Sequence, residues 1–341
     1  MLTGKDNATV KRYAALLKDG KARAAQNLFL LEGGRLVADA VRAGAELEAV
    51  FVREGEQGRF SDLIAEIILR ERARPGAASV GGVTVGGSDI GGAIVDVPEI
   101  GASDLGGADA VPIRRRVVFE VAETLFSKLC DTATPQGIVA AARIPAERPY
   151  GGGDALVLDG VRDPGNLGTL IRSAAGFGFK DVYLINCADV YAPKAVRSSM
   201  SAIFNVNPHI IACRPKPACH SERSEKSQPC ADPCHIERSE ESQHCADPGH
   251  TERSEESQPY AFLDGLKRQG VQILVADMDG ADVRGYRKKG PVAVIIGGEA
   301  RGVSQEARGF ADAVLSVRTA NIESLNAAVA GSVMMFFLND K

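Results

Sequence analysis

The first part of the chain alternates between segments with helical spacing of apolar residues and short apolar runs typical of strands. The predicted order is a helix in residues 8–26, a strand and helix in 28–44, a strand in 47–52, a helix in 60–74, a strand and helix in 117–130 and a strand in 137–144. This alternation predicts a small α/β domain within residues 1–144.

A stretch containing Pro and Gly, residues 145–153, predicts a linker to a second domain, residues 154–341. Strands are predicted in residues 155–161, 182–186, 271–278, 292–298 and 313–317, a helix and strand in 192–206, and helices in 169–178, 260–268 and from about Ser324 onward. Strands that alternate with helices indicate a mainly parallel sheet with both faces covered. The predicted fold class is therefore α/β in both domains.

Two stretches interrupt the alternation. Residues 75–111 are Gly-rich with scattered Val and Ile, which is typical of a flexible insertion. Residues 213–259 hold most of a repeat with a 15-residue period: CHSERSEKSQPCADP, CHIERSEESQHCADP and GHTERSEESQPYAFL. Its Cys and His residues raise the alternative of a metal site, but the third copy has Gly249 and Tyr260 in place of the two cysteines. We expect a disordered surface insertion with no metal and no catalytic role.

Composition and charge add information about the surroundings of the protein. The chain is 45% hydrophobic and 25% charged, as in ordinary globular proteins, and no apolar run approaches the roughly 20 residues that cross a bilayer. The amino end lacks the apolar core of a secretory signal, so we expect a cytoplasmic protein without membrane attachment. Residues 213–259 hold ten acidic and six basic residues and account for the net charge of −4, whereas the first 23 residues are basic. A basic amino end suits the phosphates of RNA.

The first stretch with candidate chemistry is VRDPGNLGTLIRSAAGFGF, residues 161–179. It joins a predicted strand to a predicted helix, where ligands bind in open α/β sheets. Pro164 and Gly165 predict a turn, and Thr169 is a candidate helix cap. Asn166 would project from the loop, and Arg172 would lie on the same side in the first turn, suited to a phosphate or carboxylate. The alternative is an ordinary capped helix with a surface arginine.

Two further stretches place glycines and polar groups at strand ends. VAVIIGGEARGVS, residues 292–304, ends a buried strand with Gly297, Gly298, Glu299 and Gly302, where paired glycines allow a flat ligand to approach the backbone. SVRTANIESLNAAVAGSVMMFFL, residues 316–338, places Ser324 and Asn326 at the start of a helix. The alternatives are a tight turn with an exposed glutamate and an N-capped, core-packed helix.

The order and spacing of the three motifs resemble those of the SpoU (TrmH) family of RNA ribose 2′-O-methyltransferases. DPGNLGTLIRSAAGFG, IIGGEARGVS and ESLNAAVAGS match the motifs of that family. NLFLLEGGRLVADAV and DTATPQGIVAA resemble the ribosomal-protein-like RNA-binding domain of the family and its exit. The resemblance implies a deep trefoil knot formed by the loops after the strands at 292–296 and 313–317 and by the start of the last helix.

The same resemblance implies S-adenosylmethionine as the cofactor and assigns candidate residues to it. Those that match its contacts are Gly297, Val317 and Leu325, with Gly298 and Gly302 giving clearance. The candidate catalytic residues are Arg172, Asn166, Glu299, Ser324 and Asn326. Arginine stays protonated, so we expect Arg172 to position the RNA. Glu299 is the candidate for proton transfer. Two departures concern the cofactor loop: Arg318 stands where the family often has proline, and the loop to Ser324 is one residue shorter than in some relatives.

The resemblance further implies a homodimer that acts on structured RNA, not DNA. Small residues on the last helix, among them Ala327, Ala328, Ala330 and Gly331, are compatible with close helix packing. The additional amino-terminal domain favours 23S ribosomal RNA over transfer RNA. Two other classes remain open from the residues alone. A non-catalytic RNA-binding or ribosome-assembly protein would need no cofactor, and a nicotinamide oxidoreductase is disfavoured because GxGxxG is absent.

Overall fold

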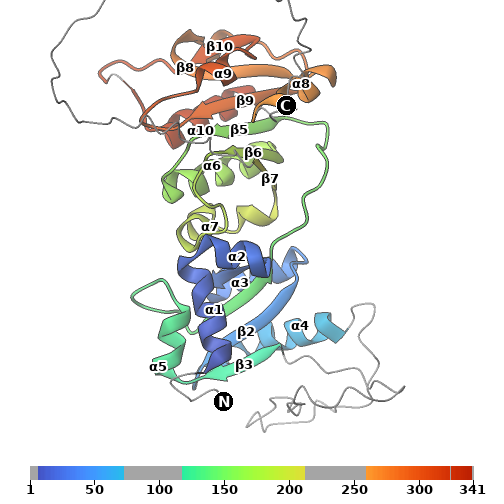
Figure 1. Ribbon diagram of the computed structural model, residues 1–341, viewed down its shortest axis with the longest axis vertical. Helices are drawn as coiled ribbons and strands as arrows, with labels where there is room; N and C mark the ends of the chain where they lie inside the picture. Colours follow the sequence, from blue (N-terminus) through green and yellow to red (C-terminus); the bar gives the residue numbers. More distant parts are fainter. Residues whose placement is uncertain (1–6, 73–116, 212–258, 323, 340–341) are drawn as a thin grey trace, which may run out of the picture.

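The computed structural model describes residues 7–72, 117–211, 259–322 and 324–339. Two α/β units lie end to end along the long axis of the molecule (Figure 1). The Gly-rich stretch 75–111 and residues 213–258 of the repeat insertion fall outside the described residues, so the expectations for them stay predictions.

The amino-terminal unit is built on a four-stranded sheet with strand order β1-β4-β2-β3. β1 and β2 run antiparallel to β4, and β2 runs parallel to β3. The elements are α1 (Ala8–Lys18), α2 (Gly20–Gln26), β1 (Leu28–Glu32), α3 (Gly34–Arg42), β2 (Leu47–Arg53), α4 (Ser61–Arg72), β3 (Val118–Val121), α5 (Glu123–Phe126) and β4 (Ile138–Arg143). The helix predicted over residues 8–26 is two helices, because Asp19 is extended and caps α2 by accepting from the N–H of Lys21.

The second unit has a six-stranded sheet with order β10-β8-β9-β5-β6-β7, and every pairing is parallel. Its elements are β5 (Ala155–Asp159), α6 (Pro164–Phe177), β6 (Asp181–Ile185), α7 (Pro193–Ser199), β7 (Asn207–Ile211), α8 (Ala261–Arg268), β8 (Gln272–Asp282), β9 (Val292–Gly297), α9 (Gln305–Arg308), β10 (Ala313–Ser316) and α10 (Ala327–Leu338). The α/β class with a mainly parallel sheet is confirmed. The strand predicted within residues 192–206 lies instead at β7.

Both faces of this sheet are covered, as the near-continuous apolar strands predict. Alternate residues of β5 belong to different cores: Leu156 and Leu158 pack with α6, α7 and α10, whereas Ala155 and Val157 pack with α8 and α9. After β10, at the sheet edge, the chain returns to the middle, where Gly331 of α10 lies against α6 and β9. This return is the path that the family resemblance implies for the knotted segment.

The two units meet where α7 and the loop before it contact α2 and β1, as Figure 1 shows. Arg23 is buried there and its Nε donates to Asp189 at 2.8 Å, so this basic residue joins the units and is not available to RNA. The ring of Phe29 packs at 5.0 Å from that of Tyr191. Apolar and ionic contacts together fix α7, which in turn carries α6.

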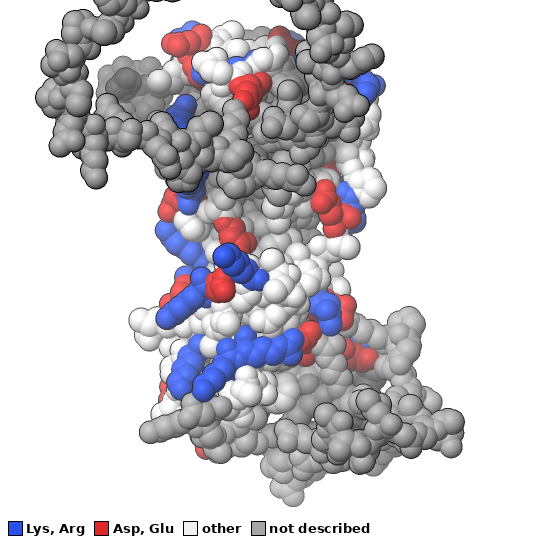
Figure 2. All heavy atoms as spheres, viewed as in Figure 1, with Lys and Arg blue, Asp and Glu red and all other residues white. Residues whose placement is uncertain are grey.

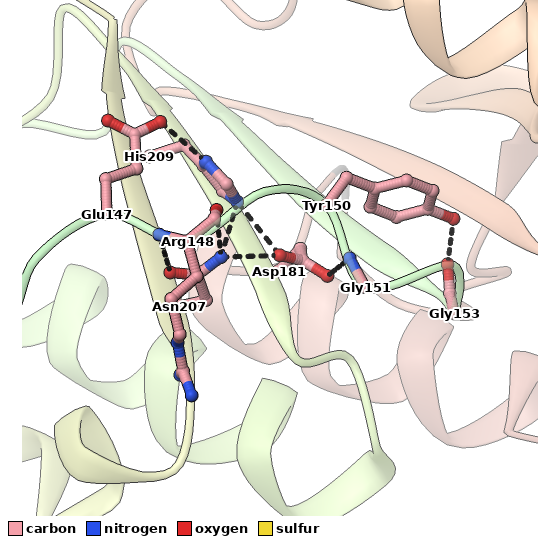
Figure 3. A network of polar contacts seen from close by, with 8 residues as sticks. All are labelled: Glu147, Arg148, Tyr150, Gly151, Gly153, Asp181, Asn207 and His209. Carbon is pink, nitrogen blue, oxygen red and sulfur yellow. Dashed lines mark hydrogen bonds and ion pairs between the residues drawn. The ribbon is translucent and has the colours of Figure 1, made fainter.

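The linker between the units is held by polar side chains at the amino ends of β6 and β7 (Figure 3). The Asn207 amide accepts from the backbone N–H of Arg148 at 3.2 Å and donates to its carbonyl at 2.8 Å. Asp181 accepts from the N–H of Gly151 at 3.1 Å, and His209 lies between Asp181 and Glu147 at 2.9 and 2.8 Å. The linker is thus attached at the amino ends of the strands, opposite the carboxyl end of β9 where Gly297 and Gly298 lie.

Candidate active site

Hydrogen bonds connect the three sequence motifs in a single chain of side chains. The amide nitrogen of Asn326 donates to the amide oxygen of Asn166 at 3.2 Å, and the amide nitrogen of Asn166 donates to a carboxylate oxygen of Glu299. These residues precede α10, begin α6 and follow β9, respectively. The carboxyl ends of β5 and β9 therefore bring together polar groups from segments distant in sequence.

The first motif begins its helix earlier than the sequence predicts. Asp163 is the N-cap of α6, and Pro164 is the first helical residue, where its fixed φ and missing N–H cause no loss. The Asp163 carboxylate accepts from the N–H of Asn166 at 2.9 Å and from Lys194 at 3.0 Å. Thr169 is within the helix and donates to the Gly165 carbonyl, so the expectation that it caps α6 is wrong. The signal missed was an acidic residue directly before proline.

The earlier start moves Arg172 away from Asn166. Arg172 is six positions after Asn166 in the helix, which corresponds to about 9 Å along the axis, so Arg172 is in the third turn and not the first. Its side chain is exposed, and no hydrogen bond or ion pair to it is recorded within the described part of the chain. The expected placement of Asn166 and Arg172 on one side of a first turn is therefore wrong.

The glycines of the second motif are required by the backbone itself. A Cβ on Gly297 would lie 2.1 Å from the carbonyl carbon of Gly302, and one on Gly298 would lie 2.2 Å from the carbonyl oxygen of Gly160. Gly302 has φ of +63°, which disfavours other residues. The loop after β9 thus folds tightly on itself and against the end of β5, and Glu299 projects from it exposed to solvent.

The third motif is capped by Asn326 and not by Ser324. The Asn326 side-chain oxygen accepts from the N–H groups of Ala328 and Val329 at 2.9 and 3.3 Å, and α10 begins at Ala327. Ser324 is exposed, and Leu325 is half-buried just before the cap. Val317, after β10, is half-buried against the core. The structure therefore places Asn166, Glu299 and Asn326 in contact, and records no contact of Ser324 with them.

The exposed side of α10 carries large apolar residues. Val329, Phe336 and Phe337 are 48%, 60% and 42% exposed, and Phe336 packs edge-on to Phe177 of α6 at 5.9 Å. Ser173 and Ser332 join the two helices through their hydroxyls at 2.6 Å. This apolar face, defined by Val329, Phe336 and Phe337, belongs to the same helix pair as Arg172.

Within the residues that the structure describes, no group of three or more His, Cys, Asp or Glu side chains is able to hold a metal. Burial raises the pKa of Cys187 to about 11, which keeps its thiol protonated. In the same residues, every helix is too short or too polar to pass through a lipid bilayer.

Comparison with known proteins agrees with the fold and the motifs. The SpoU rRNA Methylase family matches residues 154–225 and 232–336, and the MRM3-like substrate binding domain matches residues 7–74. Because the first match extends over more than half of the chain, the protein belongs to the SpoU rRNA methylase family. The prediction of an RNA methyltransferase is thereby confirmed, and the oxidoreductase alternative is excluded.

The individual relatives share less than 30% sequence identity with this chain. The chain is 28% identical over 223 residues to the 23S rRNA (guanosine(2553)-2′-O)-methyltransferase RlmP of Bacillus subtilis, which covers 64% of this chain and 71% of the relative. It is 27% identical over 351 residues to the mitochondrial rRNA methyltransferase 3 of Mus musculus, covering 94% and 69%. The SpoU methyltransferase AviRb from Streptomyces viridochromogenes, solved with AdoMet, shares the fold with a TM-score of 0.63 at 20% identity, covering 98% of each chain.

Proposed function

We propose that the protein transfers a methyl group from S-adenosylmethionine to the 2′-hydroxyl of a ribose in ribosomal RNA, with 23S rRNA as the favoured target. The observation that carries this proposal is the side-chain connection from Asn326 through Asn166 to Glu299, which unites the three motifs at one edge of the sheet. The names of RlmP and of rRNA methyltransferase 3 support the choice of ribosomal RNA.

The loops at this edge fit the proposed cofactor. The side-chain space at Gly297 and Gly298 is filled by the backbone of Gly302 and Gly160, whereas a Cβ on Gly302 would meet no atom within 4 Å. A flat purine therefore has room to approach the peptide group at Gly302. Val317 and Leu325 are half-buried and supply apolar contact beside polar backbone. S-adenosylmethionine supplies an already activated methyl group when bound. The protein then has to align the ribose and accept its proton.

Glu299 is the proposed proton acceptor. Its carboxylate is exposed, and one of its oxygens is fixed by the amide of Asn166, which leaves the other oxygen able to accept a hydrogen bond from a ribose hydroxyl. Asn326 fixes the amide of Asn166. Ser324 lies two residues before Asn326 and would orient the ribose. Arg172 keeps its charge and binds an RNA phosphate next to the reacting ribose.

A homodimer completes this site. Arg172 lies outside the connection of Asn166 and Glu299 in its own subunit, but it shares a helix pair with the apolar face of α10. Solvent exposure of Val329, Phe336 and Phe337 is unfavourable, and pairing with a second copy would bury these side chains. We assign that face to the subunit interface, where Arg172 would reach the site of the partner.

The RNA would extend from this site onto the amino-terminal unit. Figure 2 shows Lys and Arg side chains gathered over α1 and α2 and beside α7. Lys11, Lys18, Lys21 and Lys194 are exposed. Such a charge cluster binds phosphates without regard to sequence and positions the substrate.

The decisive experiment is methyl transfer from labelled S-adenosylmethionine to unmodified 23S rRNA, 16S rRNA and transfer RNA, followed by mapping of 2′-O-methyl positions. Label in 23S rRNA that is lost with Arg172→Ala supports the proposal. Label only in transfer RNA would overturn the substrate. RNA binding without cofactor binding would overturn the enzyme assignment and favour a ribosome-assembly function.

A further inference from the structure

The third copy of the 15-residue repeat has a tyrosine, Tyr260, at a position where the other two copies have cysteine. The positions equivalent to Tyr260 in the first two copies are Cys230 and Cys245. Tyr260 is 4% exposed and immediately precedes α8. Its hydroxyl donates to Oδ1 of Asp159 at 2.9 Å and accepts from the hydroxyl of Ser304 at 2.8 Å. The tyrosine therefore contacts both β5 and the loop after β9, which no cysteine at that position could do.

Asp159 holds both ends of the glycine loop, here defined as residues 297–304. Its backbone carbonyl accepts from the N–H of Gly298 at 2.8 Å, and its Oδ2 accepts from the N–H of Ser304 at 2.8 Å. Within the loop, the N–H of Gly302 donates to the carbonyl of Gly298 at 2.9 Å. One residue at the end of β5 thus fixes the loop that carries Glu299.

The carboxylate of Asp159 depends on these hydrogen bonds. Asp159 is 6% exposed, and no ion pair to it is recorded among the residues described. A buried carboxylate is tolerated only when its oxygens are hydrogen-bonded. Ser304 satisfies Oδ2 and Tyr260 satisfies Oδ1. Without the phenol, Oδ1 would lose its donor. The Asp159 carboxylate would then be held less firmly in the orientation in which Oδ2 accepts from Ser304.

The position of Tyr260 is itself fixed by packing. Its ring belongs to the apolar core that contains Leu263 and Leu266 of α8 together with Val303 and Ala307. Burial raises the pKa of Tyr260, so the hydroxyl keeps its proton and can donate to Asp159. Ser304 caps α9 by accepting from the N–H of Ala307 at 3.2 Å, which fixes the other side of the contact.

We propose that Tyr260 and Asp159 are positioning residues that hold the glycine loop, and with it Glu299, in the geometry used for methyl transfer. Neither residue touches the reacting atoms; both act through the loop. The catalytic consequence rests on the proposed function, whereas the attachment of the loop is a property of the folded chain alone. The alternative is a tyrosine that serves only to fill the core.

The test compares Tyr260→Phe with Tyr183→Phe. Both are buried tyrosines of the same core, and Tyr183 stacks on Phe262 of α8 without contacting Asp159 or Ser304. The first measurement is amide hydrogen exchange of the full-length protein without cofactor. Tyr260→Phe should speed exchange at Gly298, Gly302 and Ser304 by about tenfold, as loss of a hydrogen bond to a charged group implies. Tyr183→Phe should leave these amides unchanged.

The second measurement is a kinetic separation. Tyr260→Phe should lower kcat by about fivefold or more and raise the KM for S-adenosylmethionine, and Tyr183→Phe should change neither. Unchanged exchange in the loop, or equal acceleration in both variants, would overturn the positioning role. If the wild-type protein methylates no RNA, the proposed function fails, but the exchange data still decide whether Tyr260 holds the loop.

Discussion

The hydrogen bond from Asn326 to Asn166 joins two amides that are 160 residues apart, and its direction is set by a helix cap. The side-chain oxygen of Asn326 accepts from the first N–H groups of α10, so its nitrogen must face Asn166. The oxygen of Asn166 then accepts, and its nitrogen is left to face Glu299. The cap of α10 thereby determines that Glu299 meets a donor.

Asn326→Asp tests this relay of orientation. Aspartate caps helices as well as asparagine does, so the free energy of unfolding should change by less than about 0.5 kcal/mol. The new carboxylate cannot donate, and Asn166 would turn its nitrogen towards it and away from Glu299. We expect kcat to fall at least about tenfold, because a hydrogen bond to a charged group is lost. Asn205→Asp, at an exposed position, is the control for added charge; full activity of Asn326→Asp would contradict the relay.

Subunit complementation tests whether Arg172 acts in the site of the partner. Arg172→Ala and Asn166→Ala should each be inactive as homodimers. When equal amounts are unfolded together and refolded, mixed dimers hold one site with both residues intact, which restores roughly a quarter of wild-type activity in a symmetric dimer. Labelled methyl transfer measures the recovery. A mixture as inactive as its components would place Arg172 in the site of its own subunit.

The apolar face of α10 makes a prediction about assembly. Phe336→Asp places a charge where burial against a second copy is proposed, so the variant should be monomeric by sedimentation velocity. Leu69→Asp is the control, since Leu69 is 63% exposed and lies on α4 of the other unit. Dimers in both variants, or monomers in both, would contradict the assignment of the interface.

Local signals in the sequence predicted the class of each element better than its ends. The Asp-Pro-Gly segment was interpreted as a turn, although proline is favoured as the first residue of a helix and Asp163 is a good cap. That difference of five residues moved Arg172 by more than a turn and changed which side chains it can meet. For α10 the sequence contains two candidate N-cap residues, Ser324 and Asn326, and only the three-dimensional path of the chain shows that Asn326 caps the helix.

Contacts between distant segments had no signal in a single sequence. Strand order is one example, since β10 pairs with β8 and not with its predecessor β9, with a shift of register after Val314. Tyr260 is another example. In the sequence it is only a position where the third copy of the repeat differs from the other two, whereas in the fold its hydroxyl donates a hydrogen bond to Asp159, 101 positions away. Such contacts depend on topology, which periodicity does not encode.

The packing of α6 on α7 predicts opposite effects for two glycines of one helix. A Cβ on Gly168 would lie 2.5 Å from the carbonyl oxygen of Ala195, so the helices must separate. Gly168→Ala should lower the free energy of unfolding by about 1–3 kcal/mol. A Cβ on Gly176 would meet no atom within 4 Å. Gly176→Ala should therefore raise the free energy of unfolding by up to about 1 kcal/mol. Urea unfolding followed by circular dichroism measures both; equal effects would contradict the close packing.

The cap of α6 predicts a pH dependence. The backbone N–H of Asn166 and then the Lys194 ammonium hold the pKa of Asp163 below its usual value of 3.8. Because the folded pKa is lower than the unfolded one, the ionised cap stabilises the fold above about pH 4 and the contribution is lost as pH falls through the folded value. Asp163→Asn keeps a capping oxygen without a charge. It should be less stable than wild type at about pH 7, and this difference should shrink as the pH falls through the folded pKa of Asp163. A difference that does not change with pH would contradict the linkage.

The linker contact predicts a local loss of structure in Asn207→Ala. The substitution removes the amide that binds both backbone groups of Arg148, and it leaves Asp181 without one of its donors (Figure 3). Unsatisfied buried groups should lower the free energy of unfolding by about 1–3 kcal/mol. Because the linker is held at this point, limited proteolysis should also cut residues 145–153 faster. Asn205→Ala, two positions away and exposed, should change neither quantity. A lower free energy of unfolding without faster cleavage of the linker would show that Asn207 stabilises the sheet and not the linker.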